Sequence, residues 1–245
     1  AHKLDTYIDT VAGVIQFVKA KRRSQKDVYI SFDEWNVWYH SNQQDREILD
    51  GGNGWPHAPA LLEDIYNFED VLQVGLIINT FIRRSNVVKI ACIAQLVNVI
   101  APIMTERGGP AWRQTIYYPY YFASRFGRGK ALDLAVTCPT YDSDQYSGVA
   151  YADVAAVHTE DGGVTIFVVS RHPDEAIELE VDMIGFDDLR VVDHQILACP
   201  DLQAANTRDR QDAVAPKPGN GATLSDGRLS VALPPYSYQM IRMGR

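Results

Sequence analysis

Apolar residues in the first half of the chain recur at helical spacing, interrupted by short apolar runs. The opening segment carries an apolar side chain every three or four residues, at Leu4, Ile8, Val11, Ile15 and Val18. This spacing predicts an amphipathic helix. The run DVYISF at residues 27–32 predicts a strand, and the polar, glycine-rich residues 41–59 predict a loop.

The same order of elements continues as far as residue 125. Residues 60–84 predict a long helix whose apolar face carries Leu61, Ile65, Phe68, Leu72, Leu76 and Phe81 or Ile82. The acids Glu63 and Asp64 lie near its expected start, where a helix favours negative charge. Residues 87–100 predict a second strand, and residues 115–125 predict a helix after a loop that contains GGP. Helices that alternate with strands in this way are typical of parallel α/β units.

The pattern changes after about Gly127. Short segments of alternating apolar and polar residues are separated by turn sequences such as EDGG, RHPDE and SDG. They lie at 131–137, 149–158, 164–170, 176–183, 190–197, 228–233 and 237–243. Seven short strands at this spacing predict an antiparallel β-sandwich. We therefore expect a domain boundary between residues 126 and 127.

Charge and cysteine content narrow the possible partners. Residues 1–125 carry 13 basic and 13 acidic side chains and residues 126–245 carry 10 and 18, so the net charge of −8 lies on the second part. No block of like charge occurs, so we expect neither nucleic acid nor a membrane as partner. The cysteines, Cys92, Cys138 and Cys199, show no metal-ligand spacing, and the chain lacks an N-x-S/T sequon. We expect no metal, no cofactor and a cytoplasmic location.

The opening helical pattern has no capping residue in front of it, which favours the C-terminal part of a longer protein. Two parallel strands are also too few for an independent sheet. If they are the last strands of a (β/α)8 barrel, the chemistry lies at their C-terminal ends. Residues 33–36 and 95–98 are then the candidate site.

The segment ISFDEWNVWYH (30–40) places two acids, Asp33 and Glu34, between an apolar strand and several aromatic residues. One interpretation is a strand end whose acids face water or cap a helix. The other is a catalytic carboxylate that attacks or stabilises an anomeric carbon, while a second acid protonates the leaving oxygen. Strand alternation places the two acids on opposite sides, with Glu34 on the side of Phe32 and Asn36.

ISFDEWNVWYH, APALLEDIYNFED, AQLVNVIAPI and AWRQTIYYPYYFA together resemble glycoside hydrolase family 51, the retaining α-L-arabinofuranosidases. The ending LPPYSYQMIRM is similar to that family's C-terminal jelly roll. The resemblance implies the C-terminal part of a (β/α)8 TIM barrel over residues 1–126 and a β-sandwich (jelly-roll) domain over residues 127–245. It also implies exo-acting release of terminal non-reducing α-L-arabinofuranosyl residues from arabinan, arabinoxylan and arabino-oligosaccharides, through a covalent arabinosyl-enzyme.

The resemblance further implies roles for individual residues. Glu34 matches the nucleophile, and Trp38 and Gln95 match residues that contact the sugar. We add Asn36, on the strand side of Glu34, and Trp55, in the loop that follows, as expected substrate-binding residues. The family's acid/base glutamate follows an asparagine, and this chain contains no Asn-Glu pair. The chain is therefore expected to be inactive without the N-terminal half of the same enzyme, and a homo-oligomer is implied.

Two other functions remain open at this point. One is a carbohydrate-binding or assembly module whose sandwich does the binding, although the sandwich sequence lacks an evident aromatic platform. The other is a different glycosidase of the same barrel clan, with the same nucleophile and another sugar. His40 and His57, which flank the loop after the first strand, are either solvated loop residues or substrate contacts.

Overall fold

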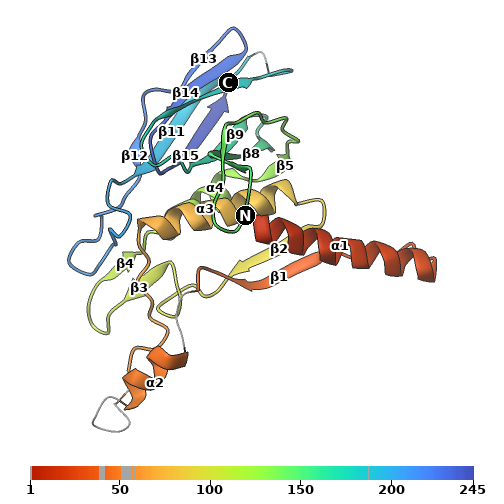
Figure 1. Cartoon of the computed structure of the whole chain (residues 1–245). Coiled ribbons are helices and arrows are strands. Elements are labelled where there is room, and N and C mark those ends of the chain that lie inside the picture. Colours follow the sequence, from red (N-terminus) through yellow and green to blue (C-terminus); the bar gives the residue numbers. More distant parts are fainter. Residues whose placement is uncertain (1, 39–41, 51–56, 58, 187) are drawn as a thin grey trace.

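The structure, a computed structural model, describes residues 2–38, 42–50, 57, 59–186 and 188–245 (Figure 1). Two antiparallel sheets lie on one side, a pair of parallel strands lies on the other, and two helices lie between them. The elements of the first half are α1 (His2–Arg22), β1 (Ile30–Trp35), α2 (Asn42–Asp50), α3 (Phe68–Arg83), β2 (Val88–Ile93), β3 (Ile103–Thr105), β4 (Ala111–Arg113) and α4 (Tyr117–Phe126). Among the described residues, no helix is both long and apolar enough to cross a membrane.

The described part of the second half consists of strands and their connections. They are β5 (Gly129–Ala131), β6 (Thr140–Tyr141), β7 (Val149–Ala150), β8 (Ala152–Thr159), β9 (Val164–Ser170), β10 (Ile177–Asp182), β11 (Arg190–Ala198), β12 (Lys217–Pro218), β13 (Thr223–Ser225), β14 (Arg228–Leu233) and β15 (Ser237–Gly244). One sheet has the order β12-β11-β15-β9-β8-β5 and the other the order β10-β14-β13. The fold is therefore mixed α/β and mostly sheet, with the antiparallel strands in the second half as expected.

The opening helix and the first strand form as predicted, with one shift. The helix, α1, packs Ile8 against β1 and α3, whereas Val18 at the end of its predicted apolar stripe is 42% exposed. The strand, β1, begins three residues later than expected and continues to Trp35. Asp33 and Glu34 therefore lie within the strand rather than after it.

Two stretches that were expected to be loops contain regular structure. The polar residues 41–59 include helix α2, which carries no apolar stripe that periodicity could detect. The GGP sequence forms the turn between β3 and β4, an antiparallel hairpin that the sequence did not predict. The following helix, α4, lies within two residues of its predicted ends.

Helix α3 starts eight residues later than predicted because of its cap. The Asn67 backbone N–H donates to Asp70 Oδ2 at 2.8 Å, and the Asp70 N–H donates to Asn67 Oδ1 at 3.1 Å. This reciprocal capping box satisfies backbone donors that the helix leaves free at its start. Glu63 and Asp64 consequently lie in the non-helical segment before the helix.

The strand predictions in the second half agree with β8, β9, β10, β11, β14 and β15. The segment 131–137 is the exception, because β5 ends at Ala131. The short strands β6, β12 and β13 were not expected. They are two or three residues long, too short to show a periodic pattern.

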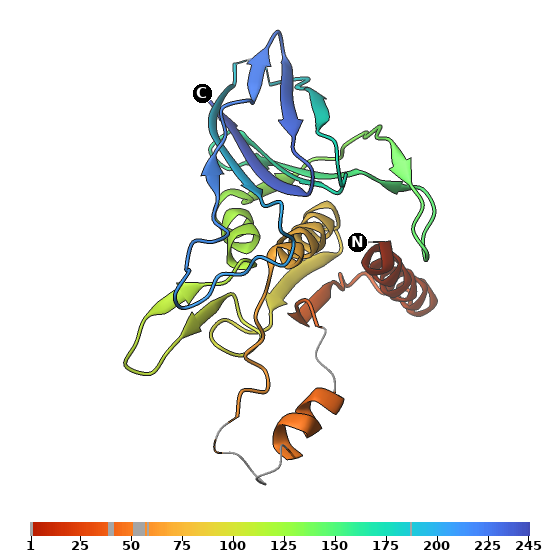
Figure 2. The same cartoon turned by 60° about the vertical axis from the view of Figure 1, so that its left-hand side comes forward.

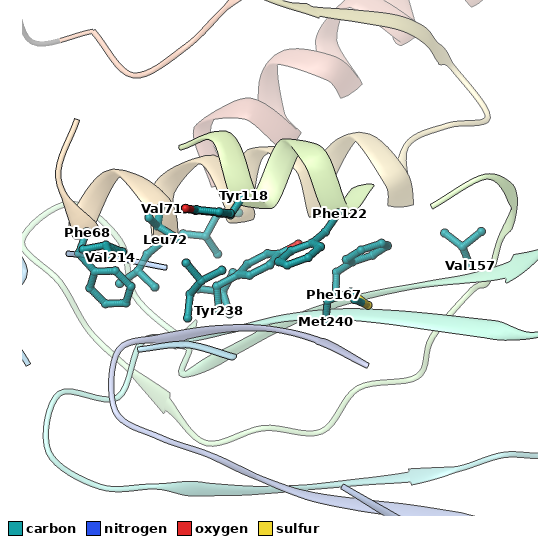
Figure 3. Packing of buried hydrophobic residues seen from close by; sticks show 13 residues of the cluster. Phe68, Val71, Leu72, Tyr118, Phe122, Val157, Phe167, Val214, Tyr238 and Met240 are labelled. Atoms are coloured by element: carbon teal, nitrogen blue, oxygen red, sulfur yellow. The ribbon is translucent and has the colours of Figure 1, made fainter. Parts of the chain in front are cut away.

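Two apolar cores join these layers. The first lies between helices α3 and α4 and the six-stranded sheet, where Phe122 stacks on Tyr238 with ring centroids 6.4 Å apart (Figure 3). The second lies between the two sheets and includes Ile166 and Val231. The other face of α3 packs on β1 and β2 through residues such as Phe81, so α3 lies between the sheet and the parallel strands (Figure 2).

Candidate functional site

A β-bulge shapes the end of β1, where both candidate acids lie. Phe32 pairs with Ala91 and Trp35 pairs with Ile93, so β1 advances three residues while β2 advances two. A bulge of this kind bends the strand and re-aims its side chains. Phe32 and Trp35 consequently lie on the same side, with ring centroids 5.0 and 5.3 Å from that of Phe81.

The bulge overturns the alternation that was expected for Asp33 and Glu34. Because Phe32 and Trp35 both face α3, simple parity does not place Glu34 on the side of Phe32. Both acids are exposed in the described structure. The role expected for Glu34 therefore rests on its sequence context and its position, and no longer on parity.

The two acids differ in their hydrogen bonds. The Ser31 hydroxyl donates to Asp33 Oδ1, which ties Asp33 to its own strand. The Glu34 carboxylate makes no hydrogen bond to any residue in the part of the chain that the structure describes. An exposed carboxylate without such bonds can approach a bound molecule, as a nucleophile must.

Trp38 lies four residues after Glu34 in the chain, and Gln95 follows β2, the strand that pairs with β1. The Ala94 N–H donates to the Trp35 carbonyl at 3.0 Å, so Gln95 leaves β2 beside the end of β1. The Gln95 side chain is exposed, and the Ala94–Gln95 peptide bond is cis. Trp38 follows β1 and is 57% exposed. The fold thus brings Glu34, Trp38 and Gln95 to the C-terminal end of the two parallel strands.

Asn36, also expected to contact substrate, is half-buried and bonded to the backbone. Its Nδ2 donates to the Ala94 carbonyl at 2.8 Å and to the Ile100 carbonyl at 2.5 Å. Its Oδ1 accepts the Val37 N–H at 2.8 Å. Trp55 and His40 lie outside the described residues, and His57 is exposed.

Two supporting residues were not found from the sequence. Gln114, 1% exposed, donates through Nε2 to the carbonyls of Asp64 and Ala101, and its Oε1 accepts the Tyr66 N–H. The buried Tyr66 hydroxyl donates to the Val37 carbonyl at 3.3 Å. These bonds hold the segment before α3 against the strand ends. A glutamine between a short strand and a helix carries no signal of this role in a single sequence.

A cavity of about 1020 Å³ lies between the start of α3 and the loops of the sandwich. Its lining includes Asp70, Tyr141, Tyr151 and Arg171, but neither Glu34 nor Gln95. Burial raises the pKa of the Asp70 carboxyl to about 6, because an ionised carboxylate is poorly solvated there. The lining also includes Val37, between Asn36 and Trp38, so this cavity borders the segment that follows β1.

Comparison with known proteins decides the family. The family model for the α-L-arabinofuranosidase C-terminal domain matches residues 33–237. The solved structure of a family 51 α-L-arabinofuranosidase from Bifidobacterium longum superposes with a TM-score of 0.88 at 32% identity, covering 99% of this chain and 47% of that one. The chain belongs to the family 51 α-L-arabinofuranosidases.

Curated relatives in this arabinofuranosidase family differ in their named linkage. The intracellular exo-α-(1→5)-L-arabinofuranosidase of Halalkalibacterium halodurans is 47% identical over 243 residues, which are 99% of this chain and 47% of the relative. The exo-α-(1→6)-L-arabinofuranosidase of Bifidobacterium longum is 39% identical over 243 residues, 98% of this chain and 46% of the relative. The chain spans about half the length of the curated relatives it matches.

Proposed function

We propose that this chain is the C-terminal part of a retaining, exo-acting α-L-arabinofuranosidase. Its substrates would be terminal non-reducing α-L-arabinofuranosyl residues of arabinan, arabinoxylan and arabino-oligosaccharides. The observation that carries the proposal is the exposed Glu34 carboxylate at the bulged end of β1, inside the match to the arabinofuranosidase family model. In this reading β1 and β2 are strands of a (β/α)8 barrel, and the packed sheets are the family's jelly roll.

The proposed chemistry uses two carboxylates in two steps. Glu34 attacks the anomeric carbon while a carboxylic acid protonates the glycosidic oxygen, and the C–O bond to the leaving group breaks. The same second carboxylate then deprotonates a water molecule, which attacks the anomeric carbon and releases Glu34. Two successive inversions retain the configuration. The two carboxyl groups would lie about 5–5.5 Å apart, as in other retaining enzymes.

The second carboxylate is proposed to come from the N-terminal half of the same enzyme. Asp33 is an unsuitable partner because it is adjacent to Glu34 and bonded to Ser31. Exposed apolar side chains around the two strands support this proposal, because parallel sheets normally have both faces covered. Among them are Phe17 on α1, Ile90 on β2 and Leu96 after it, which are 66%, 54% and 61% exposed.

The sugar is proposed to lie against Trp38, Gln95 and Trp55. Trp38 offers an aromatic face to the apolar side of a furanose ring. Gln95 offers an amide that donates and accepts hydrogen bonds at once, which suits a hydroxyl. Relatives are named for both (1→5) and (1→6) linkages. Suitable first substrates are therefore an aryl arabinofuranoside and two disaccharides, one with an α-(1→5)-linked and one with an α-(1→6)-linked arabinofuranosyl residue. We also propose an intracellular enzyme, as several relatives are named, and a homo-oligomer.

The deciding experiment replaces Glu34 in the complete enzyme. Glu34→Ala should lower kcat/KM on 4-nitrophenyl α-L-arabinofuranoside by at least about 10³-fold, because no covalent intermediate can form. Azide should restore part of the activity by filling the space of the lost carboxylate and attacking the anomeric carbon. Asp33→Asn is the matched control, since it neutralises the neighbouring acid without touching Glu34.

Asp33→Asn should keep measurable activity that azide does not increase. If Asp33→Asn is inactive and rescued by azide while Glu34→Ala remains active, the nucleophile is Asp33. A wild-type enzyme that cleaves another aryl glycoside but not the arabinofuranoside would favour a different glycosidase of the same barrel clan.

A further inference from the structure

The side-chain amide of Asn36 makes three hydrogen bonds to the backbone, which use both of its donors. Both of its N–H groups donate to carbonyls, those of Ala94 and Ile100, at 2.8 and 2.5 Å. Its oxygen accepts the Val37 N–H at 2.8 Å. Since an amide carries only two N–H donors, none remains for a sugar hydroxyl.

The two carbonyls mark the ends of the loop that carries Gln95. Within this loop the Gln95 N–H donates to the Val99 carbonyl at 3.2 Å, and at its end the Ile100 N–H donates to the Leu62 carbonyl at 2.6 Å. Asn98 and Ile100 adopt positive φ angles of 64° and 40°. A left-handed backbone is unfavourable for a β-branched residue such as Ile100, so this loop needs contacts outside itself to keep its shape.

Asn36 also has a fixed relation to the nucleophile proposed above. It lies two residues after Glu34 and one residue after the end of β1. Its amide is thus a short link between the Glu34 strand and both ends of the Gln95 loop. Such a link sets the distance between the attacking carboxylate and a sugar held by Gln95.

We propose that Asn36 is a positioning residue that fixes the Gln95 loop relative to Glu34, in place of the substrate contact expected from the sequence. The inference rests on the proposed function for its effect on rate, and on the geometry alone for its effect on the loop. A shift of about 1 Å in a positioning group is enough to lower the rate about a hundredfold.

A double-mutant cycle in the complete enzyme tests this role. Asn36→Ala and Gln95→Ala should each lower kcat/KM on the aryl arabinofuranoside by about ten- to hundredfold. Because both act through the same loop, the double variant should be within about threefold of Gln95→Ala. Multiplied losses in the double variant would show that Asn36 acts independently of Gln95, and would overturn the proposal.

The variant Asn36→Asp provides a second test, because aspartate has nearly the same size as asparagine but different hydrogen-bonding groups. Its carboxylate faces two carbonyl oxygens and cannot donate, whereas the protonated acid regains one donor. The ratio of its kcat/KM to that of the wild type should therefore rise as the pH falls. A ratio independent of pH would contradict the proposed bonds, and this variant also serves if Asn36→Ala fails to fold.

Asn206→Ala is the matched control. The buried Asn206 amide likewise donates to two carbonyls, those of Arg113 and Val214, and accepts the Val214 N–H. Its loss should lower the melting temperature as Asn36→Ala does, with kcat/KM within twofold of the wild type. An equal loss of kcat/KM in Asn206→Ala would mean that removing any buried amide with such backbone hydrogen bonds slows the enzyme, and would contradict a specific role for Asn36.

Hydrogen exchange separates this inference from the proposed function. In Asn36→Ala the amides of Gln95 and Ile100 should exchange at least tenfold faster, and in Asn206→Ala they should not. Unchanged exchange in Asn36→Ala overturns the positioning role. A wild-type enzyme without arabinofuranosidase activity contradicts the proposed function alone, because the exchange measurement does not depend on turnover.

Discussion

The two halves of the chain treat their apolar side chains differently. In the second half, every residue of β9 (Val164–Ser170) is buried between neighbouring strands and the layers on either side. In the first half, β2 leaves Ile90 more than half exposed, and α1 exposes Phe17. The central strands of the paired sheets bury their apolar side chains, whereas exposed ones in the second half, such as Val192 on β11, lie toward its edges and connections. The residues proposed for catalysis, such as Glu34, lie on the half whose strands and helices expose more apolar surface.

The largest expected effect concerns activity. Residues 1–245 produced alone should release no detectable 4-nitrophenol from the aryl arabinofuranoside, because Glu34 would lack the second carboxylate. The sandwich core should still give a cooperative unfolding transition by circular dichroism. Measurable turnover by the purified chain would show that the first half is catalytically complete and would remove the proposed need for an N-terminal half.

The next effect compares two phenylalanines in the same isolated chain. Phe167→Ala should lower the free energy of unfolding by about 3–5 kcal/mol, because it opens a cavity in the core between α4 and the sheet. Phe17→Ala should change it by less than about 0.5 kcal/mol, since that side chain is exposed. Both values follow from urea unfolding curves.

The same pair sharpens the comparison in the complete enzyme. If other residues cover α1 there, Phe17→Ala should cost about 1–3 kcal/mol, whereas the cost of Phe167→Ala should stay the same. An unchanged, negligible cost of Phe17→Ala would mean that this face of α1 is solvated in the whole protein.

A smaller effect concerns one of the ion pairs between the halves. Arg83 donates to both Asp153 oxygens, at 2.8 and 3.1 Å, and Asn79 donates to the same carboxylate. Asp153→Ala should cost about 2 kcal/mol, because it leaves a half-buried guanidinium without its partner. Asp182→Ala is the control, since its bond to Arg228 is exposed and should contribute less than about 1 kcal/mol. Equal costs from thermal unfolding would mean that burial does not distinguish the two pairs.

The last effect is the pH dependence that Asp70 gives to the free energy of unfolding. Its pKa is about 6 in the folded protein against 3.8 in the unfolded chain, so the folded state binds the proton more tightly. Its contribution therefore lowers stability as the pH rises from about 4 to 6 and is constant above that. Relative to wild type, Asp70→Asn should gain about 1–3 kcal/mol between pH 4 and pH 7. A difference that does not vary with pH would contradict the raised pKa.

The hydrophobic pattern correctly predicted helices and strands that pack one apolar face against neighbouring elements. The stripe that includes Leu4, Ile8 and Ile15 gave α1, and the alternating segments gave β8, β9 and β15. Pattern did not predict where α3 starts, because the reciprocal bonds of Asn67 and Asp70 override an apolar face that begins earlier. Helix α2 was missed because it is almost entirely polar.

The candidate site was predicted in part. Family resemblance pointed to Glu34, Trp38 and Gln95, and the fold brings them to one end of the parallel strands. Alternation failed at Glu34, because a bulge depends on the pairing of β1 with β2 and not on β1 alone. The side-chain hydrogen bonds of Gln114 join segments about 50 residues apart in the chain, and no local sequence pattern predicts such contacts.

The two-sided packing of α3 bears on how this protein can be recombined with its relatives. One face of the helix packs on β1 and β2, and the other on the six-stranded sheet. A hybrid joined at Gly127 would set one parent's α3 against the other parent's sheet and mismatch Leu72 or Leu76 with unfamiliar neighbours. A hybrid joined before Asn67 would keep that interface from a single parent, and would move the mismatch to the contacts of Phe81 with α1 and β1. Because α3 packs on both neighbours, residues of a homologue are best introduced into α3 one face at a time, together with the residues that this face contacts.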